Sequence, residues 1–289
     1  MSSQRVDTGS EHVSCVVEDA VARVRLARPE KLNGLTLPML DALVSAARTL
    51  RRDRSLRAVV LSGEGDSFCA GLDFASATKD PSGVARAFAP RPWRGTNTFQ
   101  EACWAWRRLD VPVLAAVHGH CFGGGVQLAL AADVRFTTPD ARWSVLEARW
   151  GLVPDMSGIR TLTEHVRPDV AKRLTMTGEE VDGTRAVEIG LATQVASDPG
   201  AAAQELVEAL RTRSPDAVAA TKRLFTASPG ASARSTLARE RREQSVLLVS
   251  ANTAAARRAA LDRSGASYGP RQGLSGVLRS AARRRRGGS

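Results

Sequence analysis

The sequence predicts an α/β fold followed by a helical C-terminal region. Short apolar segments alternate with segments of helical periodicity up to about Asp198, and only helical patterns follow. The content of 43% hydrophobic and 25% charged residues is ordinary for a globular protein and excludes a wholly disordered chain. A chain of 289 residues is also long enough to bury a sizeable core.

The N-terminal part predicts a hairpin, a helix and a buried strand. Polar and apolar residues alternate in 13–17 and 21–26 around a short polar turn, which is typical of a β-hairpin. Thr36 is suited to cap a helix over 37–52, because its hydroxyl can accept from a free amide of the first turn. The apolar run 56–61 is expected to form a short buried strand.

The segment 111–132 could be mistaken for a membrane span, because it holds 22 residues without Asp, Glu, Lys or Arg. Its interior, however, contains two histidines and the glycine run 123–125. We therefore expect a buried strand over 113–117, a glycine turn and a buried helix over 125–132, and no membrane contact.

The remaining elements continue the alternation and then become purely helical. Residues 75–98 are rich in Ala, Pro, Gly and Arg and are expected to form a variable loop with a little helix. The other expected helices are 99–108, 157–165, 201–211, 215–226 and 231–261, and the other expected strands are 134–137 and 142–145.

The charge is distributed unevenly along the chain. Of the net charge of +11, +8 lies in residues 257–289, so residues 1–256 carry only +3. A basic region is compatible with nucleic-acid binding, and the run 283–286 consists of four arginines. No aromatic residues interleave with this run, so base stacking has no support, and a solvated, disordered tail is favoured over RNA binding.

Cysteine usage favours a reducing compartment. The chain has four cysteines without a C-x-x-C pair, which does not make a disulfide framework, and residues 1–13 lack the apolar stretch of a signal peptide. We therefore expect a cytoplasmic protein. His118, His120 and Cys121 have no second ligand cluster at a suitable spacing, so no metal site is predicted.

Two glycine turns are candidates for anion or oxyanion binding. Residues 67–73 (SFCAGLD) follow the strand expected at 56–61, and residues 118–125 (HGHCFGGG) precede a helix. Small residues let the backbone approach a ligand closely, and free amides at a helix start can stabilise a developing negative charge. The second turn matches neither a Walker loop nor a Rossmann fingerprint. Ordinary tight turns would explain the same residues.

A third candidate segment, 143–158, places Glu147 and Asp155 in apolar, Trp-rich surroundings. Such surroundings disfavour the charged form of a carboxyl group, which suits it to proton transfer near neutral pH. Two structural alternatives remain open. Glu147 could pair with Arg149 or Arg142, and Asp155 could cap the following helix.

Taken together, these segments resemble the crotonase (enoyl-CoA hydratase/isomerase) superfamily. The resemblance is carried by 56–73, 111–158 and 174–196, with support from 28–35 and 214–222, and it extends over roughly residues 13–280. Agreement in several independent segments makes chance matching an inadequate explanation.

The resemblance implies a stacked ββα-spiral core followed by C-terminal helices. It divides the chain into an acyl-CoA-binding catalytic core over 1–198, a helical oligomerisation region over 199–280 and a basic disordered tail over 281–289. It further implies an acyl-CoA substrate and a homotrimer or homohexamer. No separate cofactor is implied, because coenzyme A enters as part of the thioester.

The resemblance also assigns functional positions. The backbone amides of Leu72 and Gly124 would hold the thioester oxygen as it becomes an enolate. The side chains of Glu147 and Asp155 would be catalytic. The remaining positions expected to contact substrate are Lys31, Leu32, Ala70, Gly71, Asp73, Gly123, Gln127 and Trp150.

The acid/base pattern departs from that of a two-glutamate hydratase. The first glutamate position of the family is Gln127 here, and the second is Glu147. Asp155 lies where dienoyl-CoA isomerase-like members and a dehalogenase branch of the family place a functional aspartate. This pattern favours an enoyl- or dienoyl-CoA isomerase. A hydratase that uses Glu147 alone is the main alternative, and dehalogenation or C–C bond chemistry through the same oxyanion site is a weaker one.

The acyl group is not determined by the sequence. Residues 75–98 are expected to line or gate the acyl pocket, and four aromatic residues are candidates to shape it. These are Phe88, Trp93, Trp143 and Trp150.

Overall fold

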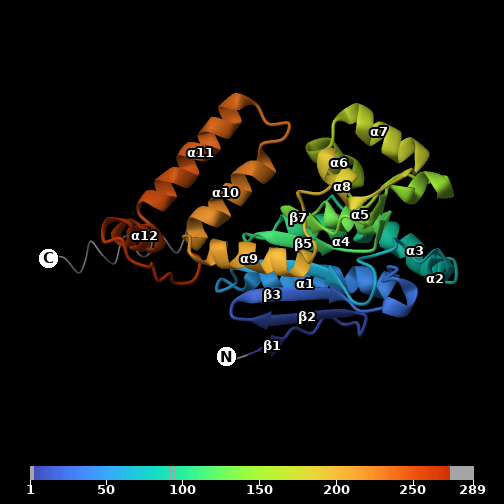
Figure 1. The fold of residues 1–289 in the computed structure, drawn as a ribbon, viewed down its shortest axis with the longest axis horizontal. Coiled ribbons are helices and arrows are strands. Elements are labelled where there is room, and N and C mark those ends of the chain that lie inside the picture. The colour runs from blue at the N-terminus through green and yellow to red at the C-terminus, as the bar shows by residue number, and fades with distance from the viewer. Residues whose placement is uncertain (1–2, 92, 94, 274–289) are drawn as a thin grey trace.

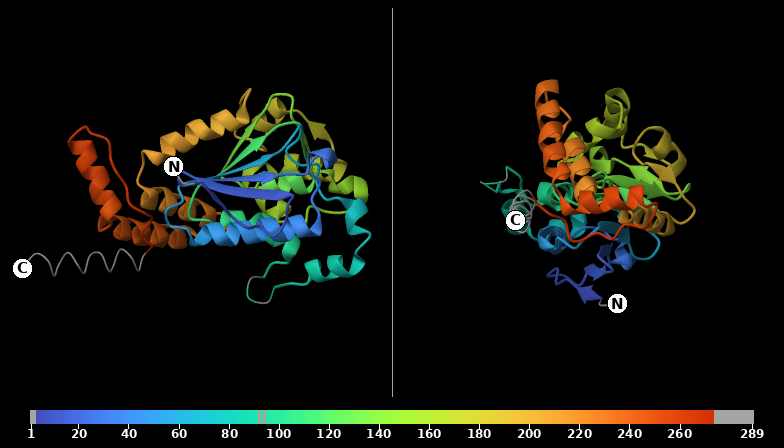
Figure 2. Two further views of the ribbon diagram at one scale, coloured as in Figure 1. Left: turned by 90° about the horizontal axis from the view of Figure 1, so that it is seen from below. Right: turned by 90° about the vertical axis from the view of Figure 1, so that its left-hand side faces the viewer.

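The computed structural model describes residues 3–91, 93 and 95–273. The arginine run 283–286 and the tail predicted over 281–289 therefore lie outside the described residues, as does the end of the helical region predicted over 199–280. Within the described part, an N-terminal α/β body carries the C-terminal helices at one end, opposite α2 (Phe74–Ala77) and α3 (Pro81–Phe88) (Figures 1 and 2).

The described residues form two β-sheets. The larger has seven strands in the order β1-β2-β3-β4-β5-β7-β10, antiparallel among β1, β2 and β3 and parallel from β3 onward. The smaller has the order β6-β8-β9. The strands are β1 (Gln4–Arg5), β2 (Val13–Glu18), β3 (Val21–Leu26), β4 (Ala58–Gly63), β5 (Val113–Val117), β6 (His120–Phe122), β7 (Val134–Thr137), β8 (Arg142–Ser144), β9 (Glu180–Val181) and β10 (Gln194–Val195).

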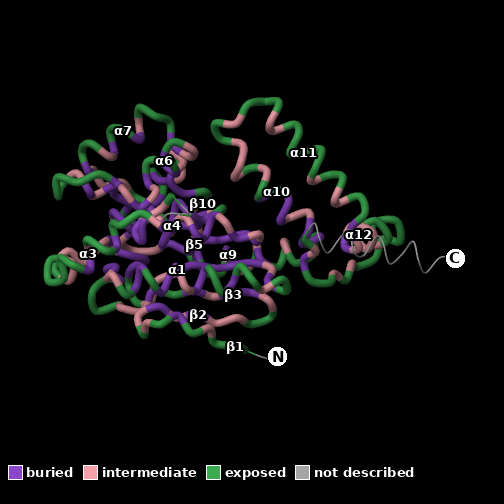
Figure 3. Tube along the Cα trace, turned by 180° about the vertical axis from the view of Figure 1, so that it is seen from behind, coloured by how far each residue is buried: buried purple, intermediate pink, exposed green. Residues whose placement is uncertain are grey.

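The central strands β4 and β5 of the large sheet are buried on both faces, which explains their near-continuous apolar sequences. In β4, Val59 and Leu61 belong to the main core, in which α1 (Leu37–Arg52) and α4 (Thr98–Arg107) pack. The alternate residues Ala58 and Val60 belong to a second cluster that includes Ala203 and Val207 of α9. In Figure 3 the buried residues, drawn in purple, gather around β5 in the middle of the body. The other helices are η1 (Pro29–Lys31), α5 (Gly124–Ala129), η2 (Leu146–Trp150), α6 (Gly158–His165), α7 (Pro168–Thr177), α8 (Gly183–Glu188), α9 (Pro199–Arg211), α10 (Pro215–Ala227), α11 (Ala233–Leu248) and α12 (Ala251–Leu261).

Several local predictions are confirmed. The hairpin β2–β3 turns at Asp19 and Ala20, which both adopt positive φ angles of the kind that a tight hairpin requires. The hydroxyl of Thr36 accepts from the amide of Met39 and caps α1 over the predicted range. The strands predicted at 113–117 and 134–137 also agree with β5 and β7.

The long helix predicted over 231–261 is wrong, because the structure divides it into α11 and α12. The break falls at Val249, which leaves helical geometry, and at Ser250. The buried Ser250 hydroxyl donates to Asp216 of α10 at 2.6 Å, and the side chain of Asn252 donates to the same oxygen at 3.0 Å. These contacts with α10 turn the chain where the local pattern would continue a helix. The strand predicted at 56–61 is displaced by two residues to Ala58–Gly63.

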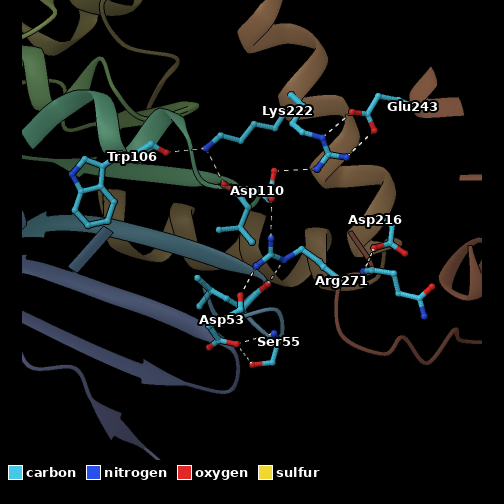
Figure 4. Close-up of polar contacts among 12 residues, drawn as sticks. Asp53, Ser55, Trp106, Asp110, Asp216, Lys222, Glu243 and Arg271 are labelled. Atoms are coloured by element: carbon cyan, nitrogen blue, oxygen red, sulfur yellow. Dashed lines mark hydrogen bonds and ion pairs between the residues drawn. The ribbon is translucent and has the colours of Figure 1, made fainter. Parts of the chain in front are cut away.

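Polar contacts join the C-terminal helices to the body (Figure 4). Arg223 of α10 bridges Asp110 and Glu243. After α12 the chain returns to the body, where the largely buried Arg271 donates to the backbone oxygens of Asp53 and Leu56. Charged and polar groups therefore define how the helices sit against the sheet.

The uncharged segment 111–132 forms the predicted strand β5 and, after the glycine run, the helix α5, which ends at Ala129 and not at the predicted residue 132. The short strand β6 between them was not predicted. Its interior is buried in the protein core, with Val113, Val117 and Leu128 almost inaccessible. No helix in the described part of the chain is long and apolar enough to cross a membrane.

Candidate active site

The two predicted glycine turns meet in space. Cys69 and Cys121 form an isolated parallel bridge, so the turn after β4 lies beside the strand β6. Gly71 has a φ of +94°, and a Cβ atom there would lie 2.9 Å from the oxygen of Phe122 and 3.5 Å from the amide of Gly124. Only glycine allows this approach without strain. The backbone next to Leu72 is thereby brought against the start of α5.

The amides of Leu72 and Gly124 are available to a ligand. The flanking groups are used by the protein, since Leu35 donates to the oxygen of Gly71 and Asp73 donates to that of Leu35. Within the described ranges, neither the Leu72 nor the Gly124 amide donates to a protein acceptor. Both residues line one cavity. Two free donors at neighbouring turns, one of them at a helix start, fit the stabilisation of an oxyanion.

Glu147 lies in η2, with 8% of its surface exposed. Its Oε1 accepts from Nε2 of Gln127 at 2.6 Å, and its Oε2 has no partner among the described residues. Burial, the largest influence, raises the pKa of Glu147, the hydrogen bond from Gln127 opposes this, and nearby Asp155 adds to it. The carboxyl group therefore binds its proton up to a higher pH than an exposed glutamate does, which suits it to proton transfer.

The proposed ion pair of Glu147 with a neighbouring arginine is absent from the described part of the structure. Arg142 and Arg149 both form ion pairs with Glu180 on β9. The side-chain partner of Glu147 is instead Gln127. The sequence alternative that made Glu147 a member of a surface ion pair is therefore wrong.

Asp155 lies in the turn between η2 and α6 and also lines the cavity. Burial raises its pKa above the ordinary value. It does not cap α6, whose N-cap residue is Ser157 and whose start has no capping side-chain hydrogen bond. The amides of Met156 and Gly158 donate instead to Oε1 of Gln127, at 2.7 and 2.9 Å. The alternative that made Asp155 a helix cap is wrong as well.

The cavity that these residues share has a volume of about 810 Å³. Apolar side chains from α2, α3, α4 and η2 form most of its wall, and the rings of Phe74 and Trp150 pack with centroids 4.7 Å apart. The predicted positions that line it are Ala70, Gly71, Leu72, Gly123, Gly124, Gln127, Glu147, Trp150 and Asp155.

Three predicted contact residues lie away from the cavity wall. Lys31 and Leu32 are exposed on the early loop, and the oxygen of Leu32 accepts from the amide of Ala70. Asp73 caps α2 and forms an ion pair with Arg28 at 2.6 Å. The hydrogen bond from Arg28 lowers the pKa of Asp73, so this carboxylate is engaged by the protein itself.

The expected aromatic lining is only partly right. Phe88 and Trp150 line the cavity, as do several other residues of 75–98. Trp93 is 96% exposed, and Trp143 is fully buried in the core, where its Nε1 donates to Thr137. Neither takes part in the wall.

Some lining residues escaped the sequence analysis. Phe74, Phe99 and Met156 contribute to the wall, although no local motif marks them. The contacts of Gln127 were missed too, although a glycine at position 158 was a usable signal. A Cβ atom at Gly158 would lie 2.5 Å from the side-chain oxygen of Gln127, so the residue must be glycine for this contact to form.

Comparison with known proteins agrees with this geometry. The family model described as enoyl-CoA hydratase/isomerase matches residues 17–263. The chain belongs to the enoyl-CoA hydratase/isomerase family. The predicted crotonase fold is confirmed by a Streptomyces coelicolor structure described as a putative enoyl-CoA hydratase, with a TM-score of 0.81, 31% identity and coverage of 90% of this chain and 95% of that one.

Curated relatives carry more than one activity. A peroxisomal Delta(3,5)-Delta(2,4)-dienoyl-CoA isomerase of Arabidopsis thaliana is 30% identical over 71% of this chain and 77% of its own length. A Mycobacterium tuberculosis protein described as a probable enoyl-CoA hydratase is 35% identical over 74% of this chain and 82% of its own length. The protein is thus an enzyme of this family whose substrate class is acyl-CoA, and its individual reaction has to be argued from its own residues.

Proposed function

We propose that this enzyme is an enoyl- or dienoyl-CoA isomerase. The observation that carries the proposal is the side-chain set around one cavity: Glu147 and Asp155 face it with raised pKa values, while Gln127 occupies the third polar position. An amide cannot take up a proton near neutral pH, so the pair of carboxyl groups that holds water in a two-glutamate hydratase is incomplete here.

The two free amides would stabilise the intermediate of this reaction. A 3-enoyl-CoA would place its thioester oxygen at the amides of Leu72 and Gly124. Removal of a proton from C2 then gives a dienolate whose charge rests largely on that oxygen. Each such donor is worth about 3–4 kcal/mol of transition-state stabilisation.

The two carboxyl groups would move the proton. One of them accepts the C2 proton, and a proton is then delivered to C4, which leaves the double bond between C2 and C3. Glu147 and Asp155 either divide these steps or one performs both. The net reaction consumes neither water nor a redox cofactor, and coenzyme A takes part only as the thioester.

The experiment that tests this proposal is a spectrophotometric screen of wild type and Asp155→Asn with 2-enoyl-, 3-enoyl- and dienoyl-CoA thioesters. We expect double-bond movement in the 3-enoyl and dienoyl substrates, with strong loss in the variant. Rapid hydration of crotonyl-CoA without any double-bond movement would refute the isomerase. It would support the alternative hydratase, in which Glu147 alone activates water.

The cavity size favours a bulky or extended acyl group. Ligand-binding pockets typically have volumes of about 300–1,000 Å³, and the cavity of about 810 Å³ lies in the upper part of that range. Its apolar wall at Val84 and Phe88 of α3 would contact the acyl chain and leave the polar end of the cavity to the thioester.

We further propose that the C-terminal helices form the subunit contacts of a homotrimer or homohexamer. No residue of α11 is buried, and α11 projects from the body in Figure 1. Leu237, Leu248 and Val249 are exposed on or beside it. Sedimentation measurements would test this: a monomer at micromolar concentration would contradict it. The four cysteines are free and buried, in keeping with the cytoplasmic location that we propose.

A further inference from the structure

We propose that Gln127 is a positioning residue that fixes Glu147 and the turn carrying Asp155 relative to each other, and thereby assigns Oε2 of Glu147 as the oxygen that exchanges the proton. This inference rests on the proposed proton-transfer role of Glu147. Gln127, which replaces the first glutamate of the two-glutamate pattern, thus serves proton transfer by holding the two carboxyl groups in place.

The orientation of the Gln127 amide is fixed by its partners. Its Oε1 accepts from two backbone amides, those of Met156 and Gly158, at 2.7 and 2.9 Å. A flipped amide would place its NH₂ group against two donors, so Nε2 must face Glu147, where it donates at 2.6 Å. Gln127 is 1% exposed, and the hydrogen bonds are therefore protected from water.

The hydrogen bond from Nε2 makes the two oxygens of Glu147 unequal. Oε1 already accepts this bond, and it lies 3.4 Å from the position of a Cβ at Gly123. Oε2 has no partner among the described residues. A proton on the carboxyl group would therefore reside on Oε2, because a proton on Oε1 would face the Gln127 donor.

The other half of the Gln127 side chain holds a strained turn. Ser157 has a φ of +72°, an unfavourable conformation for a residue with a side chain. It lies between Met156 and Gly158, whose amides both donate to Gln127, and it directly follows the segment of Asp155. The two hydrogen bonds offset the cost of this conformation and fix where Asp155 enters the cavity.

The test compares Gln127→Met and Gln127→Glu with wild type. The first removes every polar contact at a similar size. The second keeps an acceptor for Met156 and Gly158 but places a second carboxyl oxygen against Glu147, so that the pair must share a proton. Asp155 acts electrostatically on Glu147, and both carboxyl groups act on the buried Cys103 thiol of α4. Asp155 and Cys103 are unchanged in the two variants.

We expect kcat for 3-hexenoyl-CoA to fall about 10²-fold in Gln127→Met, with KM little changed, because the carboxyl groups lose their alignment. The acid limb of the pH–kcat profile should move to higher pH in both variants, since the donor that favours ionised Glu147 is lost. Ser250→Ala is the control. It removes a buried hydrogen bond of 2.6 Å in the C-terminal helices and should lower stability without moving the profile.

An infrared titration separates failure of this inference from failure of the proposed function. The infrared carboxyl band of Glu147 is identified by its absence from Glu147→Gln. Its intensity then reports the protonation of Glu147 in the absence of substrate. An unchanged midpoint of that band in both Gln127 variants would overturn the positioning role. A shifted midpoint, together with full activity of Glu147→Gln, would retain the positioning role and refute the proposed proton transfer. If Gln127→Met does not fold, Gln127→Leu gives the same readouts, because it also lacks the donor and adds no charge next to Glu147.

Discussion

The ammonium group of Lys222 on α10 lies 2.7 Å from the carboxylate of Asp133, which precedes β7. The lysine is 8% exposed and also donates to the backbone oxygens of Trp106 and Val111, and Figure 4 shows it directed from α10 into the body. Asp133 in turn accepts from the amide of Val113 at the start of β5. One buried cation thus joins the C-terminal helices to the central strands of the sheet.

Replacing Lys222 by Met should destabilise the protein by about 3 kcal/mol, because two buried oxygens and the Asp133 carboxylate lose their donor. Urea unfolding followed by circular dichroism would measure this loss. The urea concentration at the midpoint should fall, while the dependence of the unfolding free energy on urea concentration stays unchanged. The double variant Lys222→Met with Asp133→Asn should recover part of it, since the unpaired charge is removed. A midpoint equal to that of wild type would show that solvent replaces the ion pair without cost.

Elements with local signals were predicted from the sequence, whereas distant contacts were not. The cap of α1 depends on Thr36 and the three residues that follow it, so its start could be predicted. The break before α12 depends on Asp216, 34 positions from Ser250, and no local pattern contains that contact. The local pattern of 231–261 therefore predicts one helix where the structure has two.

The same distinction applies to the candidate site. The glycine turns could be predicted because one follows an expected strand and the other precedes an expected helix. The two carboxyl groups could be predicted because charged side chains are unusual in apolar surroundings. Trp143 and Trp150 lie in one segment with similar neighbours, yet the pairing of β8 with β6 buries the first and leaves the second at the cavity. Likewise, the contacts of Gln127 join residues 20 to 31 positions away and follow only from the fold.

The variants Glu147→Gln and Asp155→Asn should each lower kcat for 3-enoyl-CoA by about 10²–10⁴-fold if both carboxyl groups transfer protons. Acyl-CoA affinity, measured by calorimetry with a saturated thioester, should stay within a few-fold of wild type, because the amides and the apolar wall are retained. Glu180→Gln is a matched control, since Glu180 is a nearby carboxylate that pairs with Arg142 and Arg149 outside the cavity. Turnover near the wild-type value in either variant would assign that residue a structural role.

Asp155→Asn should increase the stability of the protein near neutral pH. Burial raises the pKa of Asp155, so the folded state holds this proton more tightly than the unfolded chain does. Its contribution to stability is therefore lost as the pH rises from the ordinary value of 3.8 through the raised folded value. Thermal unfolding should show a higher melting temperature for Asp155→Asn than for wild type at about pH 7. This difference should be smaller at about pH 4.

Asp73→Asn provides the opposite case. The hydrogen bond from Arg28 lowers the pKa of Asp73, so this carboxylate contributes stability that is present at neutral pH and is lost as the pH falls. The variant should consequently be less stable than wild type near neutral pH. For Asp155→Asn, by contrast, a stability below that of wild type near neutral pH would contradict the prediction. It would mean that ionised Asp155 makes a stabilising contact.

Gly71→Ala should impair catalysis beyond its effect on stability. A methyl group there would lie 2.9 Å from the oxygen of Phe122 and 3.5 Å from the amide of Gly124, so the turn bearing the Leu72 amide must shift. The loss of an aligned donor should lower kcat by about 10²–10³-fold. Gly9→Ala is the control, because Gly9 has a similar φ of +80° with open space around it. Gly9→Ala should lose about 1–2 kcal/mol through backbone strain, and Gly71→Ala should lose more because of its close contacts. Urea unfolding measures the two losses of stability. If Gly71→Ala is the less stable variant and its kcat still equals that of Gly9→Ala, then the approach of the two turns does not serve the reaction.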